Sequence, residues 1–275
     1  MGVLYHPEGA LFLSTLPNHG GPIKRFLKAS GVQTWEELVG LTRPRAAQAR
    51  DSLMESYKPA SVQHAVSAAR SLMRFFADRG KVEVNVMADL KTKGTSQVPL
   101  WNVLQVGEEE KILAAVRGAH RKRDRAVLLM LIDHGLRASE LCKLRWSDLF
   151  REPTGRYVMT TVGKSGKPFR MRLSERSVAA ALEWSGQAHG AKDLFVFRGD
   201  VALASLTRQD VWAIVRRWAK AIGSRVTPHG LRATFISRTL ARTGDMEKTR
   251  RLARHESAAT TGRYARWEVL DDVEE

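Results

Sequence analysis

The chain has 275 residues, 43% of them hydrophobic and 27% charged, which is typical of a globular protein with a sizeable core. Its 45 lysines and arginines exceed the 29 acidic residues, giving a formal net charge of +16. This excess favours a polyanionic partner, most often nucleic acid and sometimes a membrane surface, although a merely soluble surface has the same composition. The single cysteine, Cys142, excludes an intrachain disulfide and argues against a zinc cluster.

Targeting and membrane signals are weak. The longest apolar run, residues 126–132, is far shorter than a bilayer span, and the N-terminus lacks the pattern of a signal peptide. We therefore predict a soluble, cytoplasmic protein with no membrane partner.

The first part of the chain has a helical pattern. Residues 1–22 are rich in proline and glycine and are predicted to be irregular. Apolar residues recur every three or four positions over Ser61–Arg79, which predicts a helix capped by its first residue and ended by the next glycine. Two shorter helices are expected before it, one opening with a capping box formed by Thr34 and Glu37, the other over 46–57. The pattern predicts an all-α bundle.

A polar stretch without apolar periodicity, KTKGTSQVP, follows this bundle. We place a linker at residues 93–99, between a helical domain over 1–92 and a second domain over 100–275. The second domain is predicted to be mainly α with a small β-sheet. Its expected elements are helices over 107–117, 123–133, 139–146 and 207–222, a β-hairpin over 157–173, and a helix starting at Thr227-Pro228.

Residues 227–264 carry the chemistry that cleavage of a phosphodiester without metal would need. His229 and Arg232 lie three positions apart on the predicted helix, and His255 and Tyr264 follow among further arginines. Arginine forks neutralise phosphate oxygens, and a phenol is both a nucleophile and a leaving group. We find no acid cluster spaced to hold magnesium, so a route without metal or other cofactor is predicted. Taken singly, each of these residues is more readily explained as part of a basic surface.

Five segments in order resemble the tyrosine recombinases of the phage-integrase superfamily. They are RDRAVLLMLIDHG (123–135), GLRASELCKLRWSDL (135–149), VGKSGKPFRMRL (162–173), HGLRATF (229–235) and the run 252–264. The resemblance covers about residues 100–266. It implies a helical core-binding domain followed by an α+β catalytic domain.

The resemblance also implies catalytic roles for particular residues. Tyr264 would attack the phosphate and form a 3′-phosphotyrosine, while Arg137 and Arg232 would hold the non-bridging oxygens. The resemblance also implies a general acid, which is a lysine of the predicted hairpin. Lys164, preferred over Lys167, would protonate the leaving 5′-oxygen.

Two histidines and an acid complete the implied site. His229 would act on the tyrosine proton, His255 would hydrogen-bond the phosphate, and Glu140 would orient the other groups. Where the family usually has Leu-Gly-His, this chain has Ala253-Arg254-His255. Arginine enters a positive-φ conformation less readily than glycine, so we expect the local turn to differ.

The function implied is that of a site-specific DNA recombinase or integrase, working on double-stranded DNA without metal, ATP or cofactor. The resemblance further implies a tetramer on DNA, accessory DNA-bending proteins as further partners, and a prokaryotic, archaeal or phage protein at the nucleoid. Helices over 61–79 and 207–222 are candidate base readers. Trp267 and Leu270 of the tail are candidates for contact with a neighbouring protomer.

Two alternatives stay open at this stage. A type IB topoisomerase-like enzyme shares the nucleophile but relaxes supercoils without pairing two sites. A DNA-binding protein that uses the same scaffold without catalysis would form no covalent adduct. The nine-residue step from His255 to Tyr264 favours the recombinase.

Overall fold

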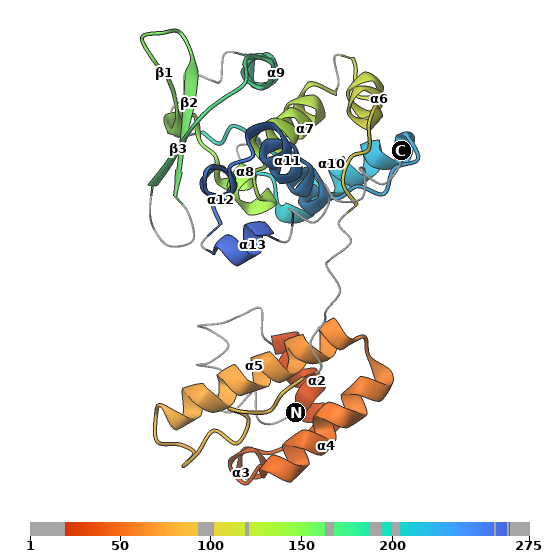
Figure 1. Cartoon of the computed structure of the whole chain (residues 1–275), viewed down its shortest axis with the longest axis vertical. Helices are drawn as coiled ribbons and strands as arrows, with labels where there is room; N and C mark the ends of the chain where they lie inside the picture. Colours follow the sequence, from red (N-terminus) through yellow and green to blue (C-terminus); the bar gives the residue numbers. More distant parts are fainter. Residues whose placement is uncertain are drawn as a thin grey trace. The chain divides into compact units, whose positions relative to one another are not determined.

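The computed structural model describes residues 20–92, 102–118, 121–162, 168–186, 194–199, 204–255, 257–262 and 264. The chain divides into two compact units, Met1–Val98 and Pro99–Glu275 (Figure 1). Among the described helices, none is both long enough and apolar enough to cross a membrane. The predicted linker at 93–99 lies outside the described residues.

The N-terminal unit is helical throughout its described part. Its helices are α2 (Gly20–Ser30), α3 (Trp35–Val39), α4 (Arg43–Ser56) and α5 (Pro59–Ala77). Helix α2 packs against both α4 and α5 (Figure 1). The core between them includes Phe26, Leu72 and Phe76, and the ring of Trp35 meets Phe76 edge-on at 4.8 Å.

The local signals placed these helices correctly but missed some of their ends. The capping box of Thr34 and Glu37 is confirmed at the start of α3. Helix α5 begins at Pro59, not at Ser61, because a proline at the first turn needs no N–H partner. Helix α2 already includes residues 20–22, for which the sequence predicts irregular structure, and α4 starts at Arg43, before the predicted residue 46.

The C-terminal unit combines helices with one small sheet, as the sequence predicted. In chain order its elements are α6 (Glu108–Ala115), α7 (Lys122–His134), α8 (Ala138–Lys143), a 3-10 turn (Trp146–Asp148), β1 (Leu149–Arg151), β2 (Tyr157–Val162), β3 (Pro168–Arg172), α9 (Glu175–Ser185), α10 (Arg208–Ala221), α11 (Pro228–Thr243), α12 (Met246–Ala253) and α13 (Ala258–Gly262). Figure 1 shows the sheet at one side of this unit, beside the helices.

The predicted hairpin is present and carries one more strand. Strands β1, β2 and β3 form an antiparallel sheet in sequence order, with Met159 opposite both Leu149 and Met171. Strand β1 was not predicted, because three residues are too few to show an alternating pattern. Helix α9 was also missed. The predicted helix over 139–146 divides into α8 and the separate 3-10 turn.

Helix α7 is the centre of the C-terminal unit and is buried along most of its length, packing against α9 and α11. It ends at Gly135, whose φ of 55° is left-handed. A Cβ on this glycine would lie 2.3 Å from the Phe235 ring of α11. The close approach brings the starts of α8 and α11 to the same place, where the candidate site forms.

Candidate active site

Two arginines from different elements meet beside the C-terminal end of α7. Arg137 is the N-cap residue of α8, and Arg232 lies one turn into α11. The Arg232 guanidinium is buried, and its Nη1 donates to the Gly135 carbonyl at 2.6 Å. Arg137 has a side chain that is 41% exposed, so it remains available to a ligand. The two predicted arginines are thus brought together.

Glu140 is the acid that these arginines share. Its Oε2 accepts from the backbone N–H of Arg137 at 2.9 Å, and its Oε1 accepts from the Arg137 side chain at 2.6 Å. The same Oε2 lies 3.9 Å from Nη1 of Arg232 and 3.1 Å from Nη2 of Arg254. Burial alone would raise the pKa of Glu140, but Arg254, Arg137 and Arg232 outweigh burial and lower it.

The turn after α12 also holds both arginines, through its backbone. Arg254 has φ 55° and ψ 43°, and the N–H of His255 returns to the Arg250 carbonyl at 3.0 Å. The Ala253 carbonyl accepts from Nη2 of Arg232, and the Arg254 carbonyl accepts from Nη2 of Arg137 at 3.2 Å. Arginine adopts the left-handed conformation that glycine normally provides.

His255 and Tyr264 lie together behind this turn. Their rings stack with centroids 5.8 Å apart, and Nδ1 of His255 is hydrogen-bonded to Thr261 Oγ1 at 2.9 Å. Both residues are buried, and Tyr264 packs in a small apolar cluster with Ile236 and Ala253. Desolvation, followed by the charges of Arg232, Arg137 and Arg254, lowers the pKa of His255 to about 3.

His229 occupies the first turn of α11, one turn before Arg232. Partial desolvation and the charges of Arg232 and Arg137 lower its pKa. The lowered pKa makes His229 a neutral ring at neutral pH, able to accept a proton.

Other predicted residues lie outside the described part of the chain. These are the two hairpin lysines and the two tail residues, namely Lys164, Lys167, Trp267 and Leu270. The strand that follows the hairpin tip does reach the site, because Phe169 of β3 lies 5.5 Å beneath the Arg254 guanidinium. Cys142 is buried, and burial raises its pKa to about 11.

Arg254 is a further member of the site, one that the sequence motifs did not indicate. Arg254 was noted only as a departure from the usual glycine, yet its side chain points into the site and contacts Glu140. The sequence did hold a signal for this contact. A buried acid such as Glu140 needs a charged partner, and Arg254 is an additional arginine that can provide one. Three-dimensional proximity of positions 140 and 254 was required to see it.

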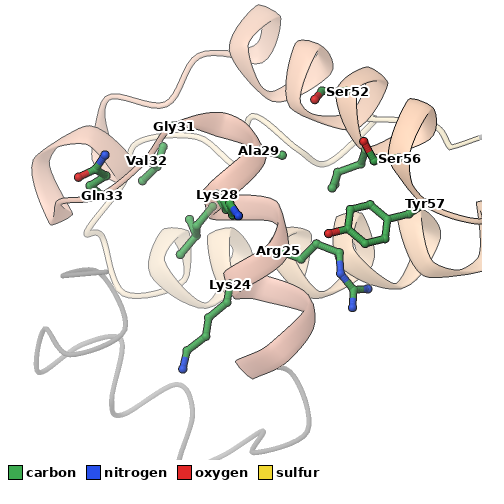
Figure 2. Close-up of a pocket in the computed structure, with 12 residues that line it drawn as sticks. Lys24, Arg25, Lys28, Ala29, Gly31, Val32, Gln33, Ser52, Ser56 and Tyr57 are labelled. Atoms are coloured by element: carbon green, nitrogen blue, oxygen red, sulfur yellow. The ribbon is translucent and has the colours of Figure 1, made fainter.

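A large cavity lies in the N-terminal unit, where no predicted catalytic residue is present. It has a volume of about 790 Å³ and is bordered by α2 and the end of α4. Figure 2 shows Lys24, Arg25 and Lys28 along α2, with Tyr57 nearby. The Arg25 guanidinium lies 4.8 Å from the centroid of the Tyr57 ring. Among the described residues of the whole chain, no three His, Cys, Asp or Glu side chains are grouped to hold a metal ion.

The chain belongs to the phage integrase family, whose model matches residues 102–269. It is similar to the tyrosine recombinase XerC of Xanthomonas campestris pv. campestris (strain B100), with 31% identity over 210 residues. That alignment covers 75% of this chain and 63% of the relative, less than two thirds of its length. The tyrosine recombinase XerC of Xylella fastidiosa (strain M23) is 27% identical over 94% of this chain and 88% of the relative.

Solved structures show the same fold. The XerH site-specific recombinase bound to a palindromic difH substrate, in a post-cleavage complex, matches with a TM-score of 0.74 and 17% identity. That match covers 95% of this chain and 80% of XerH. A lambda integrase(75-356) dimer bound to a COC' core site matches with a TM-score of 0.71 and 18% identity, covering 95% and 93% of the two chains.

Proposed function

We propose that the protein is a site-specific DNA recombinase that cuts and rejoins duplex DNA through a phosphotyrosine on Tyr264. The observation that carries the proposal is the convergence of Arg137 and Arg232 on one acid, Glu140, and one backbone turn, with His255 and Tyr264 directly behind that turn. Family membership and relatives named tyrosine recombinases support it.

The chemistry assigns one step to each group. The Tyr264 oxygen attacks the phosphorus and passes its proton to neutral His229. The bond from phosphorus to the 5′-oxygen then breaks, and Lys164 protonates that oxygen. Arg137 and Arg232 bind the non-bridging oxygens and stabilise the charge of the transition state. The covalent phosphotyrosine keeps the energy of the broken bond, so the reverse attack by a 5′-hydroxyl rejoins the strand.

The burial of Tyr264 adds a requirement to this mechanism. Its residue surface is only 2% exposed, and its ring packs against Ile236 and Ala253. A scissile phosphate at Arg137 is therefore reached only when the ring leaves part of this apolar cluster. We infer that DNA binding favours a shifted position of the short helix α13, which leads into Tyr264.

The domain assignment is also part of the proposal. Residues 1–92 form a helical DNA-binding domain, 93–99 a linker, and 100–275 the catalytic domain with its tail. Four protomers assemble on double-stranded DNA in the cytoplasm, with accessory DNA-bending proteins as further partners. Helix α10 exposes Arg208, Gln209 and Trp212, side chains suited to phosphate and base contacts.

The proposed function is tested with DNA that traps the covalent intermediate. The bound sequence is first selected from random and host DNA, and that site is then nicked close to the cleavage position. Wild-type protein should give an adduct that survives a denaturing gel, and Tyr264→Phe should give none. An adduct formed equally by Tyr264→Phe would overturn the assignment of the nucleophile.

The same DNA separates the alternatives. Exchange between two sites in one reaction supports a recombinase, whereas relaxation of a supercoiled plasmid without exchange supports a topoisomerase-like activity. Tight binding of the selected site with no adduct at any pH indicates a binding protein without catalysis.

A further inference from the structure

Arg254 is the one non-glycine residue with positive φ in the described part of the chain. For an L-residue with a Cβ, the left-handed conformation has a free-energy cost that glycine avoids. A residue with this cost at the edge of a candidate active site calls for a compensating interaction.

The compensation comes from the Arg254 side chain, which is only 4% exposed. Its Nε and Nη2 lie 3.2 Å and 3.1 Å from Oε2 of Glu140. Nη2 also donates to the Gly135 carbonyl at 2.8 Å, and Nη1 to the Leu252 carbonyl at 3.1 Å. A buried guanidinium with a carboxylate partner and two carbonyl acceptors is well satisfied.

These partners are the same groups that hold the two predicted phosphate-binding arginines. Glu140 binds Arg137, and the Gly135 carbonyl accepts from Arg232. The carbonyls of Ala253 and Arg254 accept from Arg232 and Arg137. Through these shared partners, Arg254 links the turn after α12 to the groups that hold Arg137 and to the groups that hold Arg232.

The added charge changes the electrostatic balance of the cluster. Arg137, Arg232 and Arg254 carry three positive charges against the one negative charge of Glu140, leaving a net +2. Glycine at position 254 would leave two positive charges against one, a net +1. With Arg254 pairing Glu140, more of the charge on Arg137 and Arg232 stays available to a phosphate.

We propose that Arg254 is a positioning residue that neutralises Glu140 and holds the turn after α12 in one conformation. This places Arg137, Arg232 and His255 where they can bind a phosphate. The contact of its guanidinium with Phe169 extends this link to strand β3, next to the hairpin tip. The inference rests on the proposed cleavage function, because the phosphate is its assumed ligand.

Three variants distinguish a role of Arg254 in positioning the site from a role in folding. Arg254→Gly removes the charge and also removes the strained φ, so it should fold. Arg254→Lys keeps the charge but loses the planar fork. Arg251→Ala is the matched control, because it removes one exposed positive charge from the same helix without contact to Glu140. Thermal melting and DNA affinity are measured for each.

The decisive measurement is the rate of covalent adduct formation on the nicked site, with all DNA bound. For Arg254→Gly we expect a loss of about tenfold to a hundredfold, the usual cost of a small misplacement of reacting groups. Arg254→Lys should recover part of the rate, and Arg251→Ala should cleave bound DNA as the wild type does. An Arg254→Gly rate equal to wild type across the whole pH range would overturn the proposal.

A second measurement needs no DNA and separates this inference from the proposed function. Urea midpoints are compared for Arg254→Gly, Glu140→Gln and the double variant. If Arg254 and Glu140 act as a pair, the double variant loses less than the sum of the single losses. Additive losses would overturn the inference whatever the DNA shows. If the wild type forms no adduct, the proposed function fails and this cycle still decides the pairing.

Discussion

At the scale of single residues, Glu140 is the group on which the site most depends. It is a largely buried carboxylate shared by Arg137, Arg232 and Arg254, and its pKa is lowered although burial acts in the opposite direction. Removing one partner from a buried ionic cluster leaves the remaining charges unpaired, which costs more than the cluster contributes as a whole.

Glu140→Gln should therefore destabilise the C-terminal unit by about 3 kcal/mol, because three guanidinium groups would share no carboxylate. Urea unfolding measures the loss. Glu247→Gln is the matched control, since Glu247 pairs with Arg250 on the exposed face of α12. Equal losses for the two variants would show that Glu140 is not the centre of the cluster.

The lowered pKa of His229 determines how the rate of adduct formation should change at acid pH. Its pKa is lowered from the usual 6.5, so the neutral ring that accepts the tyrosine proton persists below that pH. We expect the adduct rate to decline at acid pH as His229 becomes protonated, with the midpoint of the decline below the usual 6.5. His229→Gln should be slower and lack this decline. A wild-type decline with its midpoint above pH 6.5 would contradict the assignment.

At the scale of elements, the site forms because three chain segments approach closely at the starts of α8 and α11. Gly135 meets the Phe235 ring, and Gly230 lies against the segment that leads into the C-terminal unit. That segment is also held by side chains, because Thr234 accepts from the Leu104 N–H at 2.9 Å. The helix pattern in the sequence around Gly135 and Gly230 does not indicate these close contacts.

Gly230→Ala tests this packing. Its Cβ would lie 2.1 Å from the Asn102 carbonyl oxygen, so backbone must shift, at a cost of about 2–3 kcal/mol. Thermal melting measures the loss. Gly21→Ala is the matched control, because Gly21 is also helical but has no atom within 4 Å of the added Cβ. We expect no loss there, since alanine favours helix.

At the scale of the whole molecule, the charge of +16 is the dominant property. Neutralisation of DNA phosphates by lysine and arginine releases counterions, which makes binding strongly dependent on salt. The two units offer many such side chains, among them Lys24 and Lys28 of α2 and Arg208 of α10.

DNA affinity should therefore fall roughly a thousandfold or more between about 50 and about 200 mM salt, provided that about six phosphates are contacted. Fluorescence anisotropy with a labelled duplex measures this slope, and a scrambled duplex of the same length reports the part that is independent of sequence. Affinity that hardly changes with salt would exclude a phosphate-dominated interface.

The sequence by itself determined the features that depend on neighbours along the chain. The capping boxes at Thr34 and Thr207 and the start of α11 after Thr227 follow from side-chain to backbone contacts within one turn. The end of α7 at Gly135 follows from the left-handed conformation that glycine adopts readily. The order of the family motifs is likewise a property of the chain alone.

Only the tertiary structure decided how these motifs meet. Arg137 and Arg254 are 117 positions apart, yet the backbone carbonyl of one binds the side chain of the other. Periodicity and capping report contacts within a few residues, whereas this contact depends on the packing of α7 against α11. The same packing turns Arg254 inward and pairs its charge with Glu140, so a departure in the sequence became part of the site.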